Sequence, residues 1–377
     1  MSRFTPNGII SLVGETPRFD LGGSYGPNLR VDEVLGEVAG ALRDVVLGYG
    51  SAQGDRELRE AIAAMNDARA DDVVVTIGGV HALFLTAFTL CAPGDDVVLT
   101  TPVFPPARST LEAIGATIRE VRLAFERGYT LDINEFANAL TKETKLVSLA
   151  SPQNPSGVAI PLATLQAAVE AMNRICPRAY MLLDDTYRFA TYGDEPVAPS
   201  AGTLGPRVVT VASLSKCHGA PGVRTGWAIV RDPSLREQLV LGKFNTAISN
   251  SPVEEFLALR ILSAQEQILQ ERRAFLAASL ARTQAWIDAN AFALQWVRPD
   301  AGAICCVRLR PEVFDDGAVL RFYELLANAG ILVSRGSWFG ESDRVFRVGF
   351  GHLAPSELDS AYESFTGVLT QLAGETA

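Results

Sequence analysis

The segment from Val208 to Val230, VVTVASLSKCHGAPGVRTGWAIV, decides the class of fold. It contains two apolar runs, VVTVA and GWAIV, and neither alternates with polar residues. Continuous apolar runs of this length are typical of strands that are buried on both faces of a sheet. Lys216 follows the first run among small residues, and Arg224 lies shortly before the second. The segment therefore predicts two core strands with reactive side chains between them.

The same pattern recurs between Val73 and Val230, where short β-branched runs alternate with longer amphipathic ones. The strand-like runs are VVVT, DVVLT, IREVRL, KLVSLAS, YMLLDD, VVTVAS and GWAIV. This alternation predicts an α/β fold with a mostly parallel seven-stranded sheet sandwiched by helices. Towards the C-terminus, a long helical pattern leads to the strand-like runs GAICCVRL and VFRVGFG, which predict a smaller α+β domain. We expect a large domain at 45–270 and a small domain formed by 1–44 and 271–377.

Composition excludes several classes of function. The chain has 377 residues, 48% hydrophobic content and a formal net charge of −10, without a basic tract, so we expect neither a nucleic-acid partner nor a membrane surface. Five scattered cysteines without CxxC spacing indicate reduced thiols, and three distant histidines indicate that there is no metal site. The first residues lack the pattern of a signal peptide, so we expect a cytoplasmic protein that binds small molecules.

Polar and reactive residues follow several of the predicted strands. In open α/β sheets, ligands bind beyond the carboxyl ends of the strands, so these residues are expected to share one crevice. The glycines after VVVT open a helix, whose free N–H groups suit an anion. Neither GxxxxGK[ST] nor GxGxxG is present, which excludes the common mononucleotide and dinucleotide loops. The residues in question are Gly78, Gly79 and Val80, then Asn154, then Asp184 and Tyr187, and finally Ser213 and Lys216.

An amine and a carboxylate in one crevice suit a pyridine-type cofactor. A lysine amine forms a Schiff base with an aldehyde, and an anion at the ring nitrogen keeps the ring protonated as an electron sink. Asp184 is the candidate for that anion. The chain has four lysines, and of these we expect only Lys216 to be buried, which would lower the pKa of its amine.

The motif S-L-S-K followed by G-V-R-T-G-W resembles that of the fold-type I pyridoxal-phosphate enzymes, specifically the class I/II aminotransferase family. The resemblance covers about residues 49 to 350 and implies an aspartate aminotransferase-like fold. It implies that Lys216 carries pyridoxal 5'-phosphate as a Schiff base and that Ser213 and Arg224 bind the phosphate. An arginine suits that role because its fork donates two charge-assisted hydrogen bonds.

Other landmarks of this family occur in order along the chain. QNPSG is similar to the turn whose asparagine, Asn154, contacts the cofactor and the substrate, and DDTY is similar to the segment that supplies Asp184 and the catalytic Tyr187. TPVFP implies that Phe104 stacks on the pyridine ring, and RVFRVGFG implies that Arg347, rather than Arg344, binds the substrate carboxylate.

Two further segments carry expectations about the phosphate site. YGSAQGDRELR is similar to the family segment whose tyrosine, here Tyr49, reaches the phosphate of the neighbouring subunit, which implies a homodimer with shared active sites. In IGGVHAL, Val80 stands where the family commonly has a hydroxyl residue, so Gly78, Gly79 and Val80 are expected to contribute backbone N–H groups.

The resemblance implies an aminotransferase that exchanges an amino group between an L-amino acid and a 2-oxo acid through Lys216. A lyase, a decarboxylase or a cyclase on the same scaffold is the alternative, because the cofactor supports all of these reactions. A cofactor-sensing DNA-binding regulator is disfavoured by the net acidity and by the early start of the family match.

Overall fold

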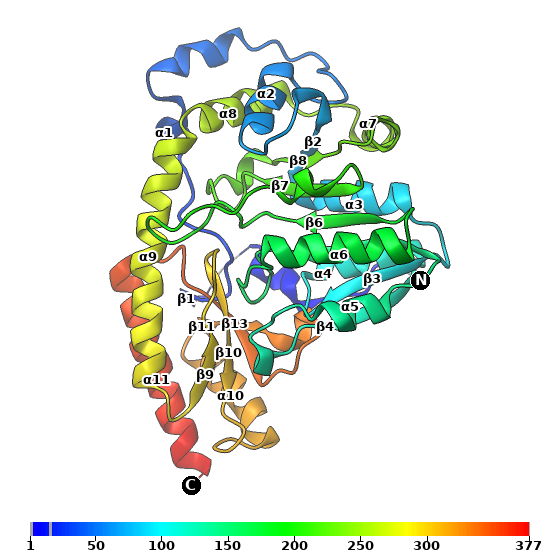
Figure 1. The fold of residues 1–377 in the computed structure, drawn as a ribbon. Coiled ribbons are helices and arrows are strands. Elements are labelled where there is room, and N and C mark those ends of the chain that lie inside the picture. Colours follow the sequence, from blue (N-terminus) through cyan, green and yellow to red (C-terminus); the bar gives the residue numbers. More distant parts are fainter. Residues whose placement is uncertain (1–2, 15–16, 377) are drawn as a thin grey trace.

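A seven-stranded sheet forms the centre of the protein (Figure 1). The computed structural model describes residues 3–14 and 17–376. The strands are β2 (Val73–Ile77), β3 (Asp96–Thr101), β4 (Thr117–Arg122), β5 (Thr144–Ala150), β6 (Tyr180–Asp184), β7 (Val208–Ser213) and β8 (Thr225–Ile229). Each of them coincides with one of the seven runs expected from the sequence, so that prediction is confirmed.

The strand order in this sheet is β2-β8-β7-β6-β5-β3-β4. Neighbouring strands are parallel from β7 through β6, β5 and β3 to β4, whereas β8 is antiparallel to both of its neighbours. The sheet is therefore mixed but mostly parallel. Because β7 and β8 run in opposite directions, the end of β7 and the start of β8 lie at the same edge.

Successive residues of the strands belong to two separate hydrophobic clusters. In β3, Val98 packs with one cluster, while Val97 and Leu99 pack with the other. In β6, Met181 and Leu183 likewise belong to the cluster of Val98, and Leu182 belongs to the cluster of Val97 and Leu99. Since successive side chains of a strand point to opposite faces, both faces of the sheet are buried, which explains the uninterrupted apolar runs.

Helices cover the two faces. One cluster is completed by α5 (Ile133–Ala139) and α6 (Leu162–Ile175), and the other by α3 (Gly78–Leu90), α4 (Pro105–Ile114) and α7 (Pro233–Ala247). A third cluster joins α2 (Arg56–Ala64) and α8 (Pro252–Ser263) to β2 and β8. The short helix α1 (Val31–Leu35) contacts α8.

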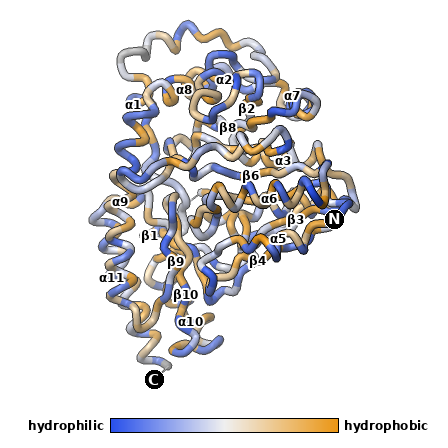
Figure 2. Tube along the Cα trace, viewed as in Figure 1, coloured by the Kyte–Doolittle hydropathy of each residue, from blue (hydrophilic) through white to orange (hydrophobic). Residues whose placement is uncertain are grey.

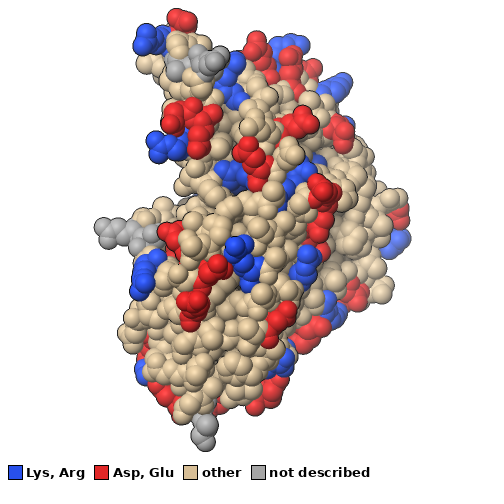
Figure 3. Space-filling view, turned by 90° about the vertical axis from the view of Figure 1, so that its left-hand side faces the viewer, with Lys and Arg blue, Asp and Glu red and all other residues tan. Residues whose placement is uncertain are grey.

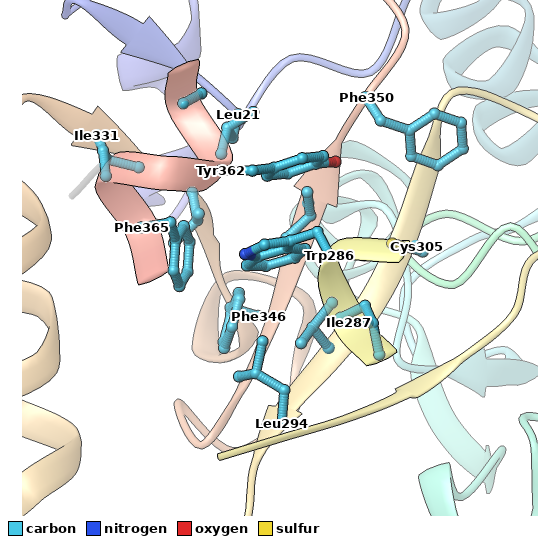
Figure 4. Packing of buried hydrophobic residues seen from close by; sticks show 14 of the residues in the cluster. Leu21, Trp286, Ile287, Leu294, Cys305, Ile331, Phe346, Phe350, Tyr362 and Phe365 are labelled. Carbon is cyan, nitrogen blue, oxygen red and sulfur yellow. The ribbon is translucent and has the colours of Figure 1, made fainter. Parts of the chain in front are cut away.

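The smaller domain is built on an antiparallel sheet in the order β12-β13-β10-β9. Its strands are β9 (Leu294–Val297), β10 (Ile304–Leu309), β12 (Ser334–Arg335) and β13 (Val345–Gly349), and β1 (Phe19–Asp20) pairs separately with β11 (Ile331–Leu332). The helices are α9 (Gln265–Ala289), α10 (Asp316–Asn328) and α11 (Pro355–Thr376). An aromatic group fills the core, where Trp286 stacks on Tyr362 with ring centroids 4.4 Å apart (Figure 4).

The 25-residue helix α9 runs along one side of the molecule and connects α8 to the small domain (Figure 1). Along α11, hydrophilic and hydrophobic residues alternate (Figure 2), and its buried side chains include Leu358, Tyr362, Phe365 and Leu369. This spacing of three and four places one helix face on the core. We propose the domain division expected from the sequence, with the addition that Leu29 and Val34 pack against the α2–α8 cluster of the large domain.

Acidic and basic side chains are interspersed on the face that Figure 3 shows. The five cysteines are all buried and unpaired. Among the helices of residues 3–14 and 17–376, none is long and apolar enough to cross a membrane.

Candidate active site

The topology gathers the predicted site residues at one edge of the large sheet. Because β5, β6 and β7 are parallel, the turn after β5 that carries Asn154 lies beside Asp184 and Ser213. Ser213 pairs with Gly226 at the start of β8, and Thr225 pairs with Ile77 at the end of β2. Arg224 and the N-terminus of α3 are therefore brought to the same edge.

Lys216 lies in the turn that follows β7 and is half-buried. The Nζ atom donates a hydrogen bond to Ser24 Oγ at 2.8 Å and lies 5.5 Å from the ring centroid of Tyr25. Burial lowers the pKa of the Lys216 amine to about 8; Arg347 and Arg224 add to the decrease and Asp184 opposes it. A larger fraction of the amine is thus neutral near pH 7, which a nucleophile requires.

The segment after β2 forms a cradle for an anion. Gly78 begins the 13-residue helix α3, whose first N–H groups have no acceptor inside the helix. The Arg224 guanidinium packs so closely on Gly78 that a Cβ atom there would overlap Nη2, and a Cβ on Gly79 would lie 3.6 Å from Ser213 Cβ. Arg224 has φ +47°, a left-handed conformation that non-glycine residues adopt mainly where their surroundings enforce it.

Asp184 ends β6 and is positioned by its neighbour. The backbone N–H and the hydroxyl of Thr186 both donate to Asp184 Oδ1, at 3.1 and 2.5 Å. Burial raises the pKa of Asp184, while the two Thr186 hydrogen bonds and the Lys216 charge oppose that rise. A cation placed beside this carboxylate would favour its ionised form further.

Arg347 lies on β13 and is 1% exposed. Among the described residues, it donates to three uncharged acceptors, namely Asn154 Oδ1 at 2.8 Å, Gly22 O at 2.5 Å and Ser334 Oγ at 3.0 Å. Its Nε atom has no partner among them. A buried guanidinium without a carboxylate is costly, so the geometry favours an anionic ligand here. Since Asn154 uses its oxygen for Arg347, its amide NH₂ group is left to face other acceptors.

A cavity of about 1110 Å³ lies over these residues. Lys216, Arg224, Arg347, Phe104 and Val80 line it. The N-terminal segment 4–13 forms part of its wall, and this segment is attached to the small domain: Asn7 Nδ2 donates to Trp338 O at 3.1 Å, and Gly8 packs against the Trp338 indole. Residues from both ends of the chain thus line the same cavity.

The remaining predicted residues are placed as follows. Tyr187 is buried, and its hydroxyl donates to the Ser24 carbonyl at 3.4 Å. Tyr49 is 85% exposed and lies outside the cavity of its own chain. The expectation that Lys216 alone among the lysines is buried was wrong, because Lys216 is only half-buried whereas Lys243 is 0% exposed on α7. Sequence analysis also missed the contact between Ser24 and Lys216, for which the only signal was the glycine-rich stretch GGSYG.

The residues of this cavity fit pyridoxal phosphate. The cradle at Gly78 and Arg224 suits a phosphate, the half-buried Asp184 suits a cationic ring nitrogen, and the Lys216 amine suits an aldehyde carbon. The unpaired Arg347 suits a carboxylate.

Comparison with known proteins agrees with this geometry. The family model for aminotransferase class I and II matches residues 29–365. The chain belongs to the class I and II aminotransferase family. Members of this family with fold type I use pyridoxal phosphate, so pyridoxal phosphate is the cofactor of this chain.

Individual members of the family are more distant. The chain is 31% identical over 306 residues to arginine–pyruvate transaminase AruH of Pseudomonas aeruginosa, covering 78% of this chain and 75% of that protein. It is 29% identical over 311 residues to capreomycidine synthase of Streptomyces vinaceus, covering 82% and 78%. A double mutant of Thermus thermophilus aspartate aminotransferase has a TM-score of 0.86 and 22% identity, with coverage of 98% and 99%, which confirms the aspartate aminotransferase-like fold.

Proposed function

We propose that this family member is an aminotransferase that exchanges an amino group between an L-amino acid and a 2-oxo acid at Lys216. One observation carries the proposal: a primary amine with a lowered pKa and a buried guanidinium without an anionic partner line one cavity, and the half-buried Asp184 carboxylate lies beside the amine at the same edge of the sheet. This combination suits a substrate that has an amino group and a carboxylate on one carbon.

Bound pyridoxal phosphate supplies an electron sink that weakens the bonds at the α-carbon of an amino acid. Asp184 would hold a proton at the ring nitrogen, and the Asn154 NH₂ group would donate to the phenolic oxygen. Arg224, Ser213 and the N–H groups of residues 78–80 would hold the phosphate, with Val80 contributing only its backbone. Lys216 Nζ would take the proton from the α-carbon of the substrate and deliver it to C4′ of the cofactor.

Arg347 and Asn154 would orient the substrate through its α-carboxylate. Binding of the carboxylate by a bidentate arginine restrains rotation about the bond to the α-carbon. This contact also stabilises the carboxylate in place, which favours transfer of the amino group over decarboxylation.

The cavity wall favours a substrate with an uncharged side chain. The residues that line it from segment 4–13 include Phe4, Ile9, Ile10, Leu12 and Val13, and none of the described lining residues is an aspartate or a glutamate. Each of the three lining cations is already assigned in the proposed site: Lys216 to the cofactor aldehyde, Arg224 to the cofactor phosphate and Arg347 to the substrate α-carboxylate. A guanidinium or a second carboxylate on the substrate would therefore find no counter-charge among the described residues of this cavity wall. The proposed substrate thus differs from arginine, which the name of the Pseudomonas relative states.

A cyclase is the second candidate, because the similarity to capreomycidine synthase is almost as high as that to the transaminase. The two activities differ in their products. Amino transfer consumes a 2-oxo acid and yields another, whereas cyclisation leaves the oxo-acid pool unchanged.

We also propose a homodimer in which Tyr49 completes the phosphate site of the partner. Val46 and Leu47 are 80% and 81% exposed beside it. Exposed apolar side chains in one short segment are typical of an interface.

The test combines covalent trapping with a substrate screen. Borohydride treatment of the purified protein loaded with pyridoxal phosphate should fix the cofactor on Lys216, detected by peptide mass spectrometry. Incubation with pools of amino acids and 2-oxo acids should then show oxo-acid exchange, with preference for bulky uncharged amino acids, and Lys216→Ala should abolish it. Trapping without any oxo-acid exchange would refute the aminotransferase, and a product cyclised from the amino acid would establish the alternative.

A further inference from the structure

Among the described residues, Ser24 provides the one side chain that forms a hydrogen bond with the Lys216 amine. The two residues are 192 positions apart in the chain. The hydroxyl and the amine are 2.8 Å apart, and the serine is 9% exposed. It is located in the stretch Leu21–Tyr25, which also lines the cavity through Gly23, Ser24 and Tyr25. The contact thus lies where the proposed reaction takes place.

The position of Ser24 is fixed from several sides. Asp20 Oδ1 accepts from the N–H groups of Gly22 and Gly23, at 2.8 and 3.0 Å. The Gly22 carbonyl accepts from both Arg347 and Ser334. Gly349 packs so tightly on Gly23 that a Cβ atom on Gly349 would overlap the Gly23 carbonyl oxygen.

The carbonyl of Ser24 itself accepts from the Tyr187 hydroxyl at 3.4 Å. Because the backbone on both sides of Ser24 is held by groups that are themselves buried, the Ser24 Cβ atom is held at a fixed place from which the hydroxyl reaches the amine. A contact that is built in this way is suited to orienting a reacting atom.

The Lys216 amine has to be a primary amine at two stages, namely before it is joined to the cofactor and whenever substrate has taken its place there. At those stages it must stay close to the reacting carbon and must accept and return a proton. Asp184 is the anion that faces it, while Arg347 and Arg224 are cations and the Tyr25 ring lies 5.5 Å away. The sulfur of Cys217, which follows in the chain, is buried.

We propose that Ser24 is a catalytic residue that orients the free ε-amine of Lys216 and stabilises a proton on it, an inference that rests on the proposed function. An ammonium donates to the serine oxygen, and a neutral amine can accept from the serine hydroxyl, so the contact persists in both protonation states. The charge-assisted form is the stronger of the two, so Ser24 raises the affinity of the amine for its proton.

The small number of lysines makes a direct test possible. In the full-length protein freed of pyridoxal phosphate, acetic anhydride labelling across a pH series, read by peptide mass spectrometry, reports the titration midpoint of each lysine. Ser24→Ala should lower the midpoint of Lys216 by about one pH unit, which is a tenfold increase in its neutral fraction below the midpoint. The exposed Lys142 and Lys145 serve as internal standards and should not shift.

The loaded enzyme provides a second measurement. Ser24→Ala should lower kcat by roughly tenfold with little change in KM, because the hydroxyl acts on the proton and not on substrate binding. Ser24→Thr retains the hydroxyl and should restore both the midpoint and most of kcat. The control Ser263→Ala removes an exposed hydroxyl that donates to Leu259 O on α8, and it should change neither quantity.

The outcomes are separable from those of the proposed function. An unchanged Lys216 midpoint in a folded Ser24→Ala protein would overturn the role of Ser24, even if borohydride fixes the cofactor on Lys216. If Ser24→Ala does not fold, Ser24→Cys keeps the side-chain volume but offers a weak acceptor, and it should show the same lowered midpoint. A failure of borohydride trapping in the unchanged protein would instead refute the function on which the inference rests.

Discussion

At the scale of single residues, Arg347 is the side chain whose role is most directly testable. Arg347→Gln should lower kcat/KM by roughly a hundredfold, because it removes a buried charge that is proposed to pair with the substrate carboxylate. The loss should appear mainly in KM and should affect every amino-acid substrate alike. Steady-state kinetics with one preferred donor and one poor donor would measure this.

Arg344 provides the matched control, since it lies three positions away on the same segment. It pairs with Asp316 at 2.6 Å and donates to Phe314 O, away from the cavity. Arg344→Gln should leave kcat/KM within about twofold of the original value. An equal loss in both variants would show that the effect is general destabilisation and would contradict the proposed contact.

The residues of the site differed in how well the sequence predicted them. Lys216, Arg224 and Asp184 follow directly from motifs next to strand ends, where local sequence fixes local position. The contact of Ser24 with Lys216 could not be predicted, because it depends on the path of a glycine-rich loop 192 residues away. The functional roles of all these residues stay predictions until the variants are measured.

At the scale of elements, α7 contains a lysine where a lysine is rare. Lys243 is 0% exposed, and its Nζ has no hydrogen-bond partner among the described residues. Burial lowers the pKa of its amine from the usual 10.5 to about 8, and Glu255 opposes that decrease. At pH 7 the folded protein therefore carries a buried ammonium at a cost in stability.

We expect Lys243→Met to increase the free energy of unfolding at pH 7 by about 1–3 kcal/mol, because a flexible apolar chain of similar length replaces the charge. Urea unfolding would measure it. Lys142→Met, at an exposed position, should change stability by less than about 0.5 kcal/mol. A lower free energy of unfolding for Lys243→Met than for the original protein would show that the buried Lys243 does not destabilise the fold.

The pH dependence of stability gives a second check on the same element. Below pH 8 both the folded and the unfolded state bind the proton of Lys243, and between about 8 and 10.5 the unfolded state binds more protons. The free energy of unfolding should therefore rise with pH across this window. Lys216 contributes in the same direction, so Lys243→Met should reduce the slope without abolishing it.

The elements themselves were well predicted where periodicity carries information. All seven strands of the large sheet follow from apolar runs, because burial on both faces removes polar residues from the strand. Periodicity does not encode direction, so the antiparallel setting of β8 was not apparent. The burial of Lys243 was missed because a lysine in a helical pattern is usually exposed.

At the scale of the whole molecule, the proposed homodimer predicts complementation between inactive subunits. Lys216→Ala and Tyr49→Ala should each be inactive or nearly so at limiting pyridoxal phosphate. If Tyr49 serves the partner, a mixed dimer has one site with both changes and one site with neither. Coexpression of the two chains should then restore about a quarter of the original activity, since half of the dimers are mixed and each has one intact site.

Two outcomes would argue against shared sites. No recovery in verified mixed dimers would show that Tyr49 acts in its own chain or not at all. A monomer in sedimentation analysis with full activity would refute the dimer itself.

The cradle for the phosphate has a consequence that reaches beyond the reaction. It is assembled from the turn after β2, the end of β7 and the residue before β8, which are held side by side in the sheet. An anion bound there would neutralise Arg224 in its left-handed conformation and would tie these three segments together, so the folded chain would gain stability from its cofactor by mass action. The supply of the vitamin-derived coenzyme would then govern how long each copy of this polypeptide survives proteolysis, as well as how fast it turns over.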